Sequence, residues 1–257
     1  MARLRDATDE PRPWIVFRAA RVLGWFLTDE NYRNAALVRL ARPPSLFQPD
    51  NFTAPDRYPD LFQLAAREVG DGKDKRVLSF GCSTGEEVFA LRRYLPSAEI
   101  QGVDINRHNI AICLRKLARK PDPGIGFWVA DSLADQPAES YDIVFCMAVF
   151  RHGALGEKVR ERCDEYIRFR DFDRETGEIA RCLRPGGLLF IENSHFRFSD
   201  TRAYCDFEAV IESRRTHGAA DGPIYDQNNQ LVRGVTWRDV TFRKTPRDVG
   251  EGPEPAR

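Results

Sequence analysis

The sequence predicts an α/β protein built on a doubly wound, mostly parallel β-sheet, and three observations support this. Short apolar or β-branched runs alternate with helical segments between about residue 76 and residue 193, a pattern typical of βαβ units. The glycine-rich stretch 81–85 joins the first of these runs to a helical segment. Asp104 ends the second run, where nucleoside-binding sheets carry an acidic residue.

The elements follow in order along the chain. A helical segment is expected at 14–42, stopped by Pro43 and Pro44, and a helix at about 58–69, ended by Gly70. A final strand is expected at 237–244. The segments 207–213 and 223–227 could also be strands, with a tight turn at 226–230. Between these parts we expect strands at 76–80, 98–105, 124–130, 141–150 and 188–193, and helices at 86–95 and 107–120 and over a charged stretch that contains 173–187.

Composition and charge weaken the case for several classes of protein. Lys plus Arg equals Asp plus Glu at 39 each among 257 residues, so no net field attracts nucleic acid. The six cysteines form no Cys-x-x-Cys pair, which favours reduced thiols over disulfides or a metal site. The apolar stretch 14–27 is too short and too charged, with Arg18 and Arg21, to span a membrane. We therefore expect a cytoplasmic protein with no membrane span and no metal.

The stretch Gly81-Cys82-Ser83-Thr84-Gly85 has two interpretations. As a nucleophile elbow it would make Ser83 the nucleophile of a hydrolase. However, no oxyanion motif of the His-Gly-Gly type precedes it, and a hydrolase gives Asp104 no role. As a cofactor loop it lets a ligand approach the backbone, and Asp104 then binds the ribose hydroxyls of a nucleoside. The second interpretation accounts for more residues.

The residues around the loop also indicate which nucleoside cofactor it binds. The dinucleotide pattern Gly-x-Gly-x-x-Gly is absent, and Glu86 and Glu87 would repel a pyrophosphate. Carboxylates suit instead the cationic ammonium end of S-adenosylmethionine. We therefore expect S-adenosylmethionine rather than NAD.

Five motifs in order resemble those of class I S-adenosylmethionine-dependent methyltransferases. They are "VLSFGCSTGEEVFAL", "GVDIN", "GFWVADSL", "YDIVFCMAVFRHG" and "ARCLRPGGLLFIEN". The resemblance implies a Rossmann-like methyltransferase fold with a seven-stranded sheet, an N-terminal helical cap, and methyl transfer. It implies contacts to the cofactor from Gly81, Cys82, Ser83, Thr84, Gly85, Glu86, Asp104, Ile105, Asn106, Asp131, Ser132, Cys146 and Met147.

The first motif is also similar to the loop of the chemotaxis-receptor glutamate methyltransferases, through "CSTGEE". That family's later signature and small domain are not found. The chain also departs from the common class I pattern, since Ser79 stands where many members carry an acid and Ser83 replaces a glycine. We expect Glu86 to make the missing contact to the ammonium group.

His152 and His195 are the candidate catalytic residues. Each follows a predicted strand at the edge where the acceptor should lie, and a histidine can serve as a base for an oxygen acceptor. Cys146 follows Phe145 rather than the proline of cytosine-5 methyltransferases, so it is not expected to be a nucleophile. The Asp/Asn-Pro-Pro-Tyr motif for exocyclic amines is absent as well.

The acceptor and the chain's organisation remain expectations. We expect a small-molecule oxygen as acceptor. Protein carboxylate methylation and a non-catalytic regulatory module that binds S-adenosylmethionine are the alternatives. Residues 1–56 form a cap that could act as a lid, pack a homodimer or lie on a membrane. Residues 57–246 form the methyltransferase domain, and 247–257 a disordered tail.

Overall fold

The structure, a computed structural model, describes residues 24, 27–28, 33, 40, 46–48, 56–210, 222–235, 237 and 239–246. The chain divides into two compact units, 1–42 and 43–257. In the first unit the few described residues are helical, and the Thr28 hydroxyl donates to the Gly24 carbonyl at 2.7 Å. Most of the expected cap at 1–56 and the expected tail at 247–257 lie outside the described residues.

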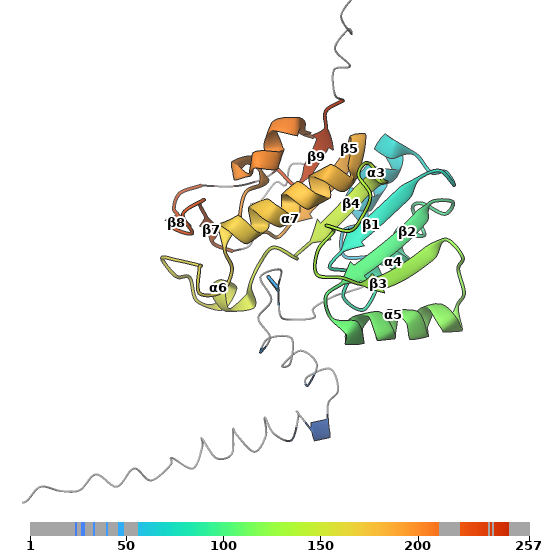
Figure 1. The fold of residues 1–257 in the computed structure, drawn as a ribbon, viewed down its shortest axis with the longest axis horizontal. Helices are drawn as coiled ribbons and strands as arrows, with labels where there is room; N and C mark the ends of the chain where they lie inside the picture. The colour runs from blue at the N-terminus through green and yellow to red at the C-terminus, as the bar shows by residue number, and fades with distance from the viewer. Residues whose placement is uncertain are drawn as a thin grey trace, which may run out of the picture. The chain divides into compact units, whose positions relative to one another are not determined.

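A seven-stranded sheet forms the centre of the second unit, in the order β3-β2-β1-β4-β5-β9-β6 (Figure 1). The first five strands are parallel, and β9 runs antiparallel between β5 and β6. The predicted doubly wound, mostly parallel sheet is therefore confirmed. The strands are β1 (Arg76–Phe80), β2 (Glu99–Asp104), β3 (Ile125–Val129), β4 (Tyr141–Met147), β5 (Leu183–Glu192), β6 (Phe207–Ala209) and β9 (Thr241–Lys244).

Helices cover both faces of this sheet because its strands carry apolar residues on both sides. On β4, Phe145 packs with the face covered by α3, α4 and α5, and Cys146 with the face covered by α7. Phe145 stacks on Phe190 of β5, with ring centroids 4.5 Å apart. The helices are α3 (Pro59–Val69), α4 (Glu86–Leu91), α5 (Arg107–Arg119), α6 (Gly153–Glu157) and α7 (Phe169–Cys182), with 3-10 turns at Phe198–Asp200 and Arg202–Asp206.

The local signals that bound these elements are visible in the sequence. Pro59 opens α3, and Gly70 ends it with a left-handed φ of 78°. Asn106 caps α5, where its side chain accepts a hydrogen bond from the His108 amide at 2.9 Å. These two helices fall at or within a residue of their predicted bounds.

The structure corrects the sequence-based prediction at several other elements. α4 ends at Leu91 rather than at residue 95, and β9 begins at Thr241 rather than at 237. The possible strand at 223–227 is confirmed at β7 (Ile224–Tyr225), which pairs with β8 (Leu231–Val232) in a separate two-stranded sheet. The predicted turn between them is confirmed, because the Asp226 carboxylate accepts hydrogen bonds from two backbone amides, those of residues 228 and 230, at 2.8 Å each.

The last strand is fixed by a buried amine. Lys244 is 3% exposed, and its Nζ donates to the carbonyls of Ala180 at 2.6 Å and Leu183 at 2.7 Å. These carbonyls lie at the end of α7, where helix carbonyls lack partners within the helix. The amine therefore ties β9 to the end of α7.

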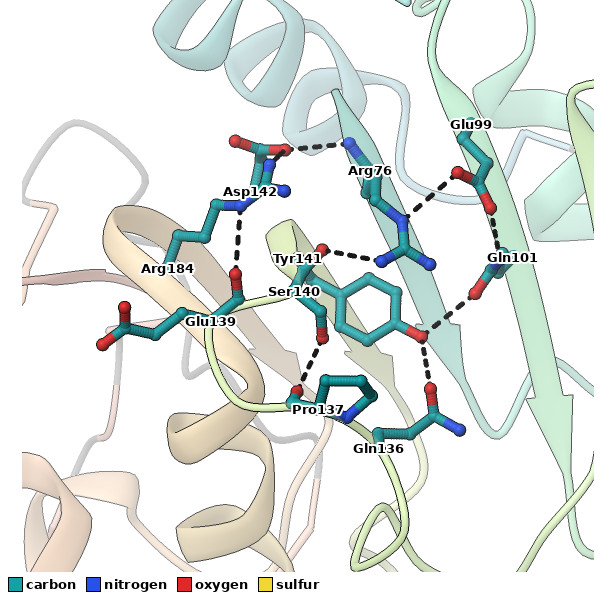
Figure 2. A network of polar contacts seen from close by, with 10 residues as sticks. All are labelled: Arg76, Glu99, Gln101, Gln136, Pro137, Glu139, Ser140, Tyr141, Asp142 and Arg184. Carbon is teal, nitrogen blue, oxygen red and sulfur yellow. Dashed lines mark hydrogen bonds and ion pairs between the residues drawn. The ribbon is translucent and has the colours of Figure 1, made fainter. Parts of the chain in front are cut away.

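A polar network holds the amino-terminal edge of the sheet together (Figure 2). The Asp142 carboxylate accepts from the Arg76 amide at 2.8 Å and from Arg184 at 2.6 Å. The Tyr141 hydroxyl hydrogen-bonds the side-chain amides of Gln101 at 3.0 Å and Gln136 at 3.2 Å, and burial raises the pKa of Tyr141 to about 12. The network links β1, β2 and β4 at the edge opposite their carboxyl ends.

Replacing Tyr141 with phenylalanine tests this network. Tyr141→Phe should lower the free energy of unfolding by about 1–2 kcal/mol, since it removes two hydrogen bonds from a fully buried side chain. Urea unfolding followed by circular dichroism measures the change. The control is Tyr204→Phe, because the described contacts of Tyr204 are ring contacts, and it should shift the value by less than about 0.5 kcal/mol. Equal effects would show that the network contributes nothing.

Candidate cofactor and acceptor site

The strand order reverses at β1 and β4, so the carboxyl ends of these strands border the crevice where ligands bind in such sheets. The loop 81–85 follows β1 at this edge. Gly81 and Gly85 have left-handed φ angles of 74° and 89°. A Cβ atom on Gly81 would lie 2.6 Å from Val149 Cγ2, so only glycine fits there. The loop thus exposes backbone at the edge where a cofactor is expected.

Asp104 anchors this loop from the end of β2. Its side chain is 8% exposed and accepts hydrogen bonds from the Ser83 amide at 2.8 Å and the Asn106 amide at 2.7 Å. The Asn109 side chain donates a third, at 3.1 Å. Burial raises the pKa of Asp104 above its ordinary value, although these hydrogen bonds favour the carboxylate. The carboxylate is therefore placed beside the loop, and its role as a ribose ligand stays a prediction.

Glu87 supplies the acid that the first motif lacks. The Ser79 hydroxyl, at the end of β1, donates to the Glu87 carboxylate at 2.7 Å. Burial raises the Glu87 pKa to about 7, while the hydrogen bond from Ser79 and the charge of Arg57 oppose that rise. Glu87 is partly buried, and a carboxylate of this kind gains from a cationic partner. It lies beside Ser79, the residue at the position where the common pattern has its acid.

Glu86, the residue predicted to bind the ammonium group, is engaged elsewhere. It forms a short ion pair with Lys116 of α5, and Thr84 Oγ1 donates to it at 2.6 Å. Burial raises the Glu86 pKa, but these two hydrogen bonds outweigh burial and lower it below its ordinary value. Lys116 also donates to the Thr84 carbonyl at 2.8 Å. Glu86 therefore helps to fix the loop to α5.

The remaining predicted cofactor residues lie on the same edge but differ in exposure. Ile105 is partly buried and Asn106 buried after β2, while Asp131 is exposed and Ser132 partly buried after β3. In the loop, the Ser83 hydroxyl is buried without a hydrogen-bond partner. The open position of Asp131 agrees with a ligand contact, although no described side chain fixes it.

Two buried thiols at this edge belong to the core. Cys146 at the end of β4 is fully buried, and burial raises its pKa well above the ordinary value. Cys82 is 3% exposed, and its pKa is raised well above the ordinary value by the neighbouring Cys113 thiol and by burial. Such thiols are unreactive, in agreement with the prediction that Cys146 is not a nucleophile. Met147, the next residue of β4, is partly exposed at the edge.

The two candidate catalytic histidines lie together after β4 and β5. His152 caps α6, where its Nδ1 accepts a hydrogen bond from the Ala154 amide at 3.3 Å. His195 Nε2 lies 3.3 Å from the His152 carbonyl, and its ring is 2% exposed. Burial lowers the His195 pKa to about 4, so this ring is neutral at physiological pH. His195 therefore supports the backbone of His152 from below the surface.

Sequence reasoning missed Glu87, Arg151 and Asn193. Arg151 Nη1 donates to the Asn193 side-chain oxygen at 3.0 Å, which joins the segments that follow β4 and β5. The helical period gave a signal for Glu87, because Leu91 one turn further on is fully buried. Nothing in the sequence pairs position 151 with position 193, because that contact depends on two left-handed turns, at Ala148 (φ 60°) and Asn193 (φ 58°).

Within the described part of the chain, no group of three or more histidine, cysteine or acidic side chains is placed to hold a metal ion. Among the described residues there is also no helix that combines the length and apolar character needed to cross a membrane.

Comparisons with known proteins identify the family of this chain. A family model described as a methyltransferase domain matches residues 71–232. A demethylmenaquinone methyltransferase of Thermus thermophilus is 30% identical over 118 residues, 46% of each chain. A phthiotriol/phenolphthiotriol dimycocerosates methyltransferase of Mycobacterium ulcerans is 28% identical over 171 residues, 66% of this chain and 53% of the relative. This chain thus matches about half the length of these relatives.

A solved structure gives a weaker likeness. Phosphoethanolamine N-methyltransferase 2 of Haemonchus contortus, in complex with S-adenosyl-L-methionine, is 20% identical, and the match covers 65% of this chain and 34% of that chain with a TM-score of 0.42. We draw no argument from a likeness this distant.

The role of Asp104 is tested by Asp104→Asn. Removing the charged acceptor should weaken binding of S-adenosylmethionine by about 10- to 100-fold, the range for a hydrogen bond to a charged group. Calorimetric titration measures the affinity, and circular dichroism checks that the variant folds, because Asp104 also holds the loop. Unchanged affinity in a folded variant would exclude Asp104 as a ligand.

Glu87 makes a pH-dependent prediction. A cationic ligand pairs with ionised Glu87, whose pKa is about 7, so the affinity for S-adenosylmethionine should rise from pH 5.5 to 7 by up to about tenfold per unit, then level off. Glu87→Gln should bind more weakly and lose most of this slope. Glu86→Gln is the matched control and should keep it. If Glu86→Gln loses the pH slope and Glu87→Gln keeps it, Glu86 is the ligand and the assignment to Glu87 is wrong.

Proposed function

This chain belongs to the methyltransferase-domain family, and we propose that it transfers the methyl group of S-adenosylmethionine to an oxygen atom of a small molecule. Methyl transfer from S-adenosylmethionine is its activity by family. The nature of the acceptor is the proposal. It rests on the arrangement of charge at the carboxyl edge of the sheet and on what the sequence lacks.

Two carboxylates beside the loop 81–85, the buried Asp104 and the partly buried Glu87, carry the assignment of the cofactor site. Glu87 and Asp104 accept hydrogen bonds, and neither forms an ion pair with a lysine or arginine among the described residues. Glu87 suits the ammonium group of the cofactor and Asp104 its ribose hydroxyls. When bound, S-adenosylmethionine supplies an electrophilic methyl group on a sulfonium. The residues present therefore fit this cofactor.

The bond between Ser79 and Glu87 also speaks against the non-catalytic alternative. That alternative depended on the serine found at position 79 in place of an acid. Because Glu87 brings a carboxylate to Ser79 from the first turn of α4, the site retains an acid at the end of β1. The substitution therefore moves the acid to another residue without removing it.

The case for a small molecule combines charge with the names of two relatives. The chain carries 39 basic and 39 acidic residues, so no net charge favours a polyanionic acceptor. The relatives of Thermus thermophilus and Mycobacterium ulcerans are named for demethylmenaquinone and for phthiotriol or phenolphthiotriol dimycocerosates. Neither is named for a protein or a nucleic acid, which supports an organic molecule as acceptor here.

The residues at the end of β4 lack the features of two routes to carbon and nitrogen acceptors, which supports the choice of oxygen. Cys146 is fully buried and cannot act as the nucleophile that a cytosine-5 mechanism needs, and the Asp/Asn-Pro-Pro-Tyr motif is absent. We propose that His152 contacts the acceptor. Its Nδ1 accepts a hydrogen bond from the Ala154 amide. The neutral ring therefore carries its proton on Nε2, which can donate a hydrogen bond to the acceptor. His195, neutral and buried, positions His152 through the hydrogen bond to its carbonyl.

An acceptor screen tests this function. Purified protein is incubated with S-adenosylmethionine and separate panels of alcohols, phenols, carboxylic acids, amines and acidic peptides. The release of S-adenosylhomocysteine and a mass increase of one methyl group in the acceptor are then measured. We expect products on oxygen in the small-molecule panels, and loss of turnover in Asp104→Asn at low cofactor concentration.

Three outcomes would overturn parts of the proposal. Products confined to amines would exclude oxygen as the acceptor atom, and products confined to acidic peptides would favour the protein carboxylate alternative. Failure to bind either S-adenosylmethionine or S-adenosylhomocysteine would remove the cofactor assignment itself.

A further inference from the structure

Two arginines, Arg151 and Arg160, follow β4 and lack the carboxylate partners that several other described arginines have. Among the described residues, neither Arg151 nor Arg160 forms an ion pair. By contrast, the partly buried Arg92, Arg197 and Arg243 each pair with a carboxylate at 2.7–2.8 Å. Of these two residues, Arg151 is partly buried and Arg160 is exposed. A partly buried cation without a counter-ion is costly, so the retention of Arg151 at this edge needs a reason.

The Arg151 guanidinium is held firmly in place. Its Nη1 donates to the Asn193 side-chain oxygen at 3.0 Å, and its Nε is buried without a hydrogen-bond partner. The His195 amide donates to the Phe150 carbonyl at 2.9 Å, which ties the segment that carries Arg151 to the end of β5. Nη1 of this guanidinium therefore has a neutral amide as its partner, whereas Nε has no hydrogen-bond partner among the described residues.

Arg160 is linked to His152, the neighbour of Arg151, by two ring contacts. The Arg160 guanidinium lies 5.2 Å from the centroid of Tyr166, whose ring lies 5.0 Å from that of His152. The Tyr225 hydroxyl donates to the Arg160 carbonyl at 3.0 Å, which connects the β7–β8 hairpin to the same region. The carboxylate of Glu192, buried at the end of β5, contributes to raising the pKa of Tyr58, after the larger effect of burial.

We propose that Arg151, oriented by Asn193 and assisted by Arg160, binds an anionic group of the methyl acceptor. This inference rests on the proposed function, since it names the class of the acceptor at the same site. A guanidinium binds a carboxylate or a phosphate through two parallel N–H···O bonds, and both groups satisfy the geometry described. The acceptor is therefore an organic acid or an organic phosphate, and its charge places it beside His152.

Binding of matched aromatic probes tests the inference on the full chain saturated with S-adenosylhomocysteine. The probes are benzoate, phenyl phosphate and the neutral isostere benzamide, titrated by calorimetry. We expect one or both anions to bind at least tenfold more tightly than benzamide, and the stronger of the two to identify a carboxylate or a phosphate acceptor. Equal binding of benzamide, or no binding of either anion, would overturn the inference.

Variants assign the binding to Arg151. Arg151→Gln should weaken anion binding by at least about tenfold, and Arg151→Lys, which keeps the charge but loses the fork, should lie between it and the parent. Arg115→Gln removes one exposed charge from α5 and should change nothing. If Arg151→Gln binds the anions as the parent does, the site is elsewhere and the inference fails.

The S-adenosylhomocysteine titration separates this inference from the function on which it rests. Every variant should bind S-adenosylhomocysteine as the parent does, because Arg151 lies outside the residues assigned to the cofactor, and this binding also shows that the variant folds. Loss of that binding in the parent would contradict the proposed function. Retained cofactor binding without anion selectivity contradicts only the role of Arg151.

Discussion

The carboxylate of Asp104 is the interaction on which the site depends. It joins the loop after β1 to the start of α5 through the amides of Ser83 and Asn106, and it does so from the end of β2. A hydrogen bond to an ionised acceptor is stronger than one between neutral groups, and a largely buried carboxylate needs several. The carboxylate that holds the loop 81–85 in its conformation is therefore also the group expected to bind the ribose.

Around this anchor the two carboxylates of α4 have different tasks. Glu86 forms an ion pair with Lys116 and accepts a hydrogen bond from Thr84, which fixes the loop to α5. Glu87 instead accepts a hydrogen bond from Ser79 and has a raised pKa. Adjacent residues on a helix point about 100° apart, so one acid reaches the neighbouring helix and the other reaches the sheet. The division separates a structural ion pair from a carboxylate that gains from a cationic ligand.

Local patterns in the sequence predicted most of the fold and the cofactor edge. The strand–loop–helix at 76–91 and Asp104 at the end of β2 follow from hydrophobic period and turn chemistry, which act over a few residues. Glu86 and Glu87 could not be told apart by such patterns, because their roles depend on what lies opposite each side chain.

Long-range contacts set the rest. The bond between Arg151 and Asn193 crosses 42 positions, and the β7–β8 hairpin packs against the segment after β4 through Tyr225. Periodicity records which residues are buried, but it does not record which turns meet. The proposed acceptor side of the site is built almost entirely from contacts between segments far apart in the sequence. It was therefore the part that the sequence predicted least.

The position of β9 has a consequence for how the chain is made. Because β9 lies between β5 and β6, the sheet has a gap until residues 241–244 are available, and the amine of Lys244 cannot reach the end of α7 before then. During synthesis the chain emerges from its N-terminus first. In a nascent chain the strands β1 to β5 would therefore be present while one edge of β5 is still unpaired. The exposed backbone of that strand is where a chaperone would bind.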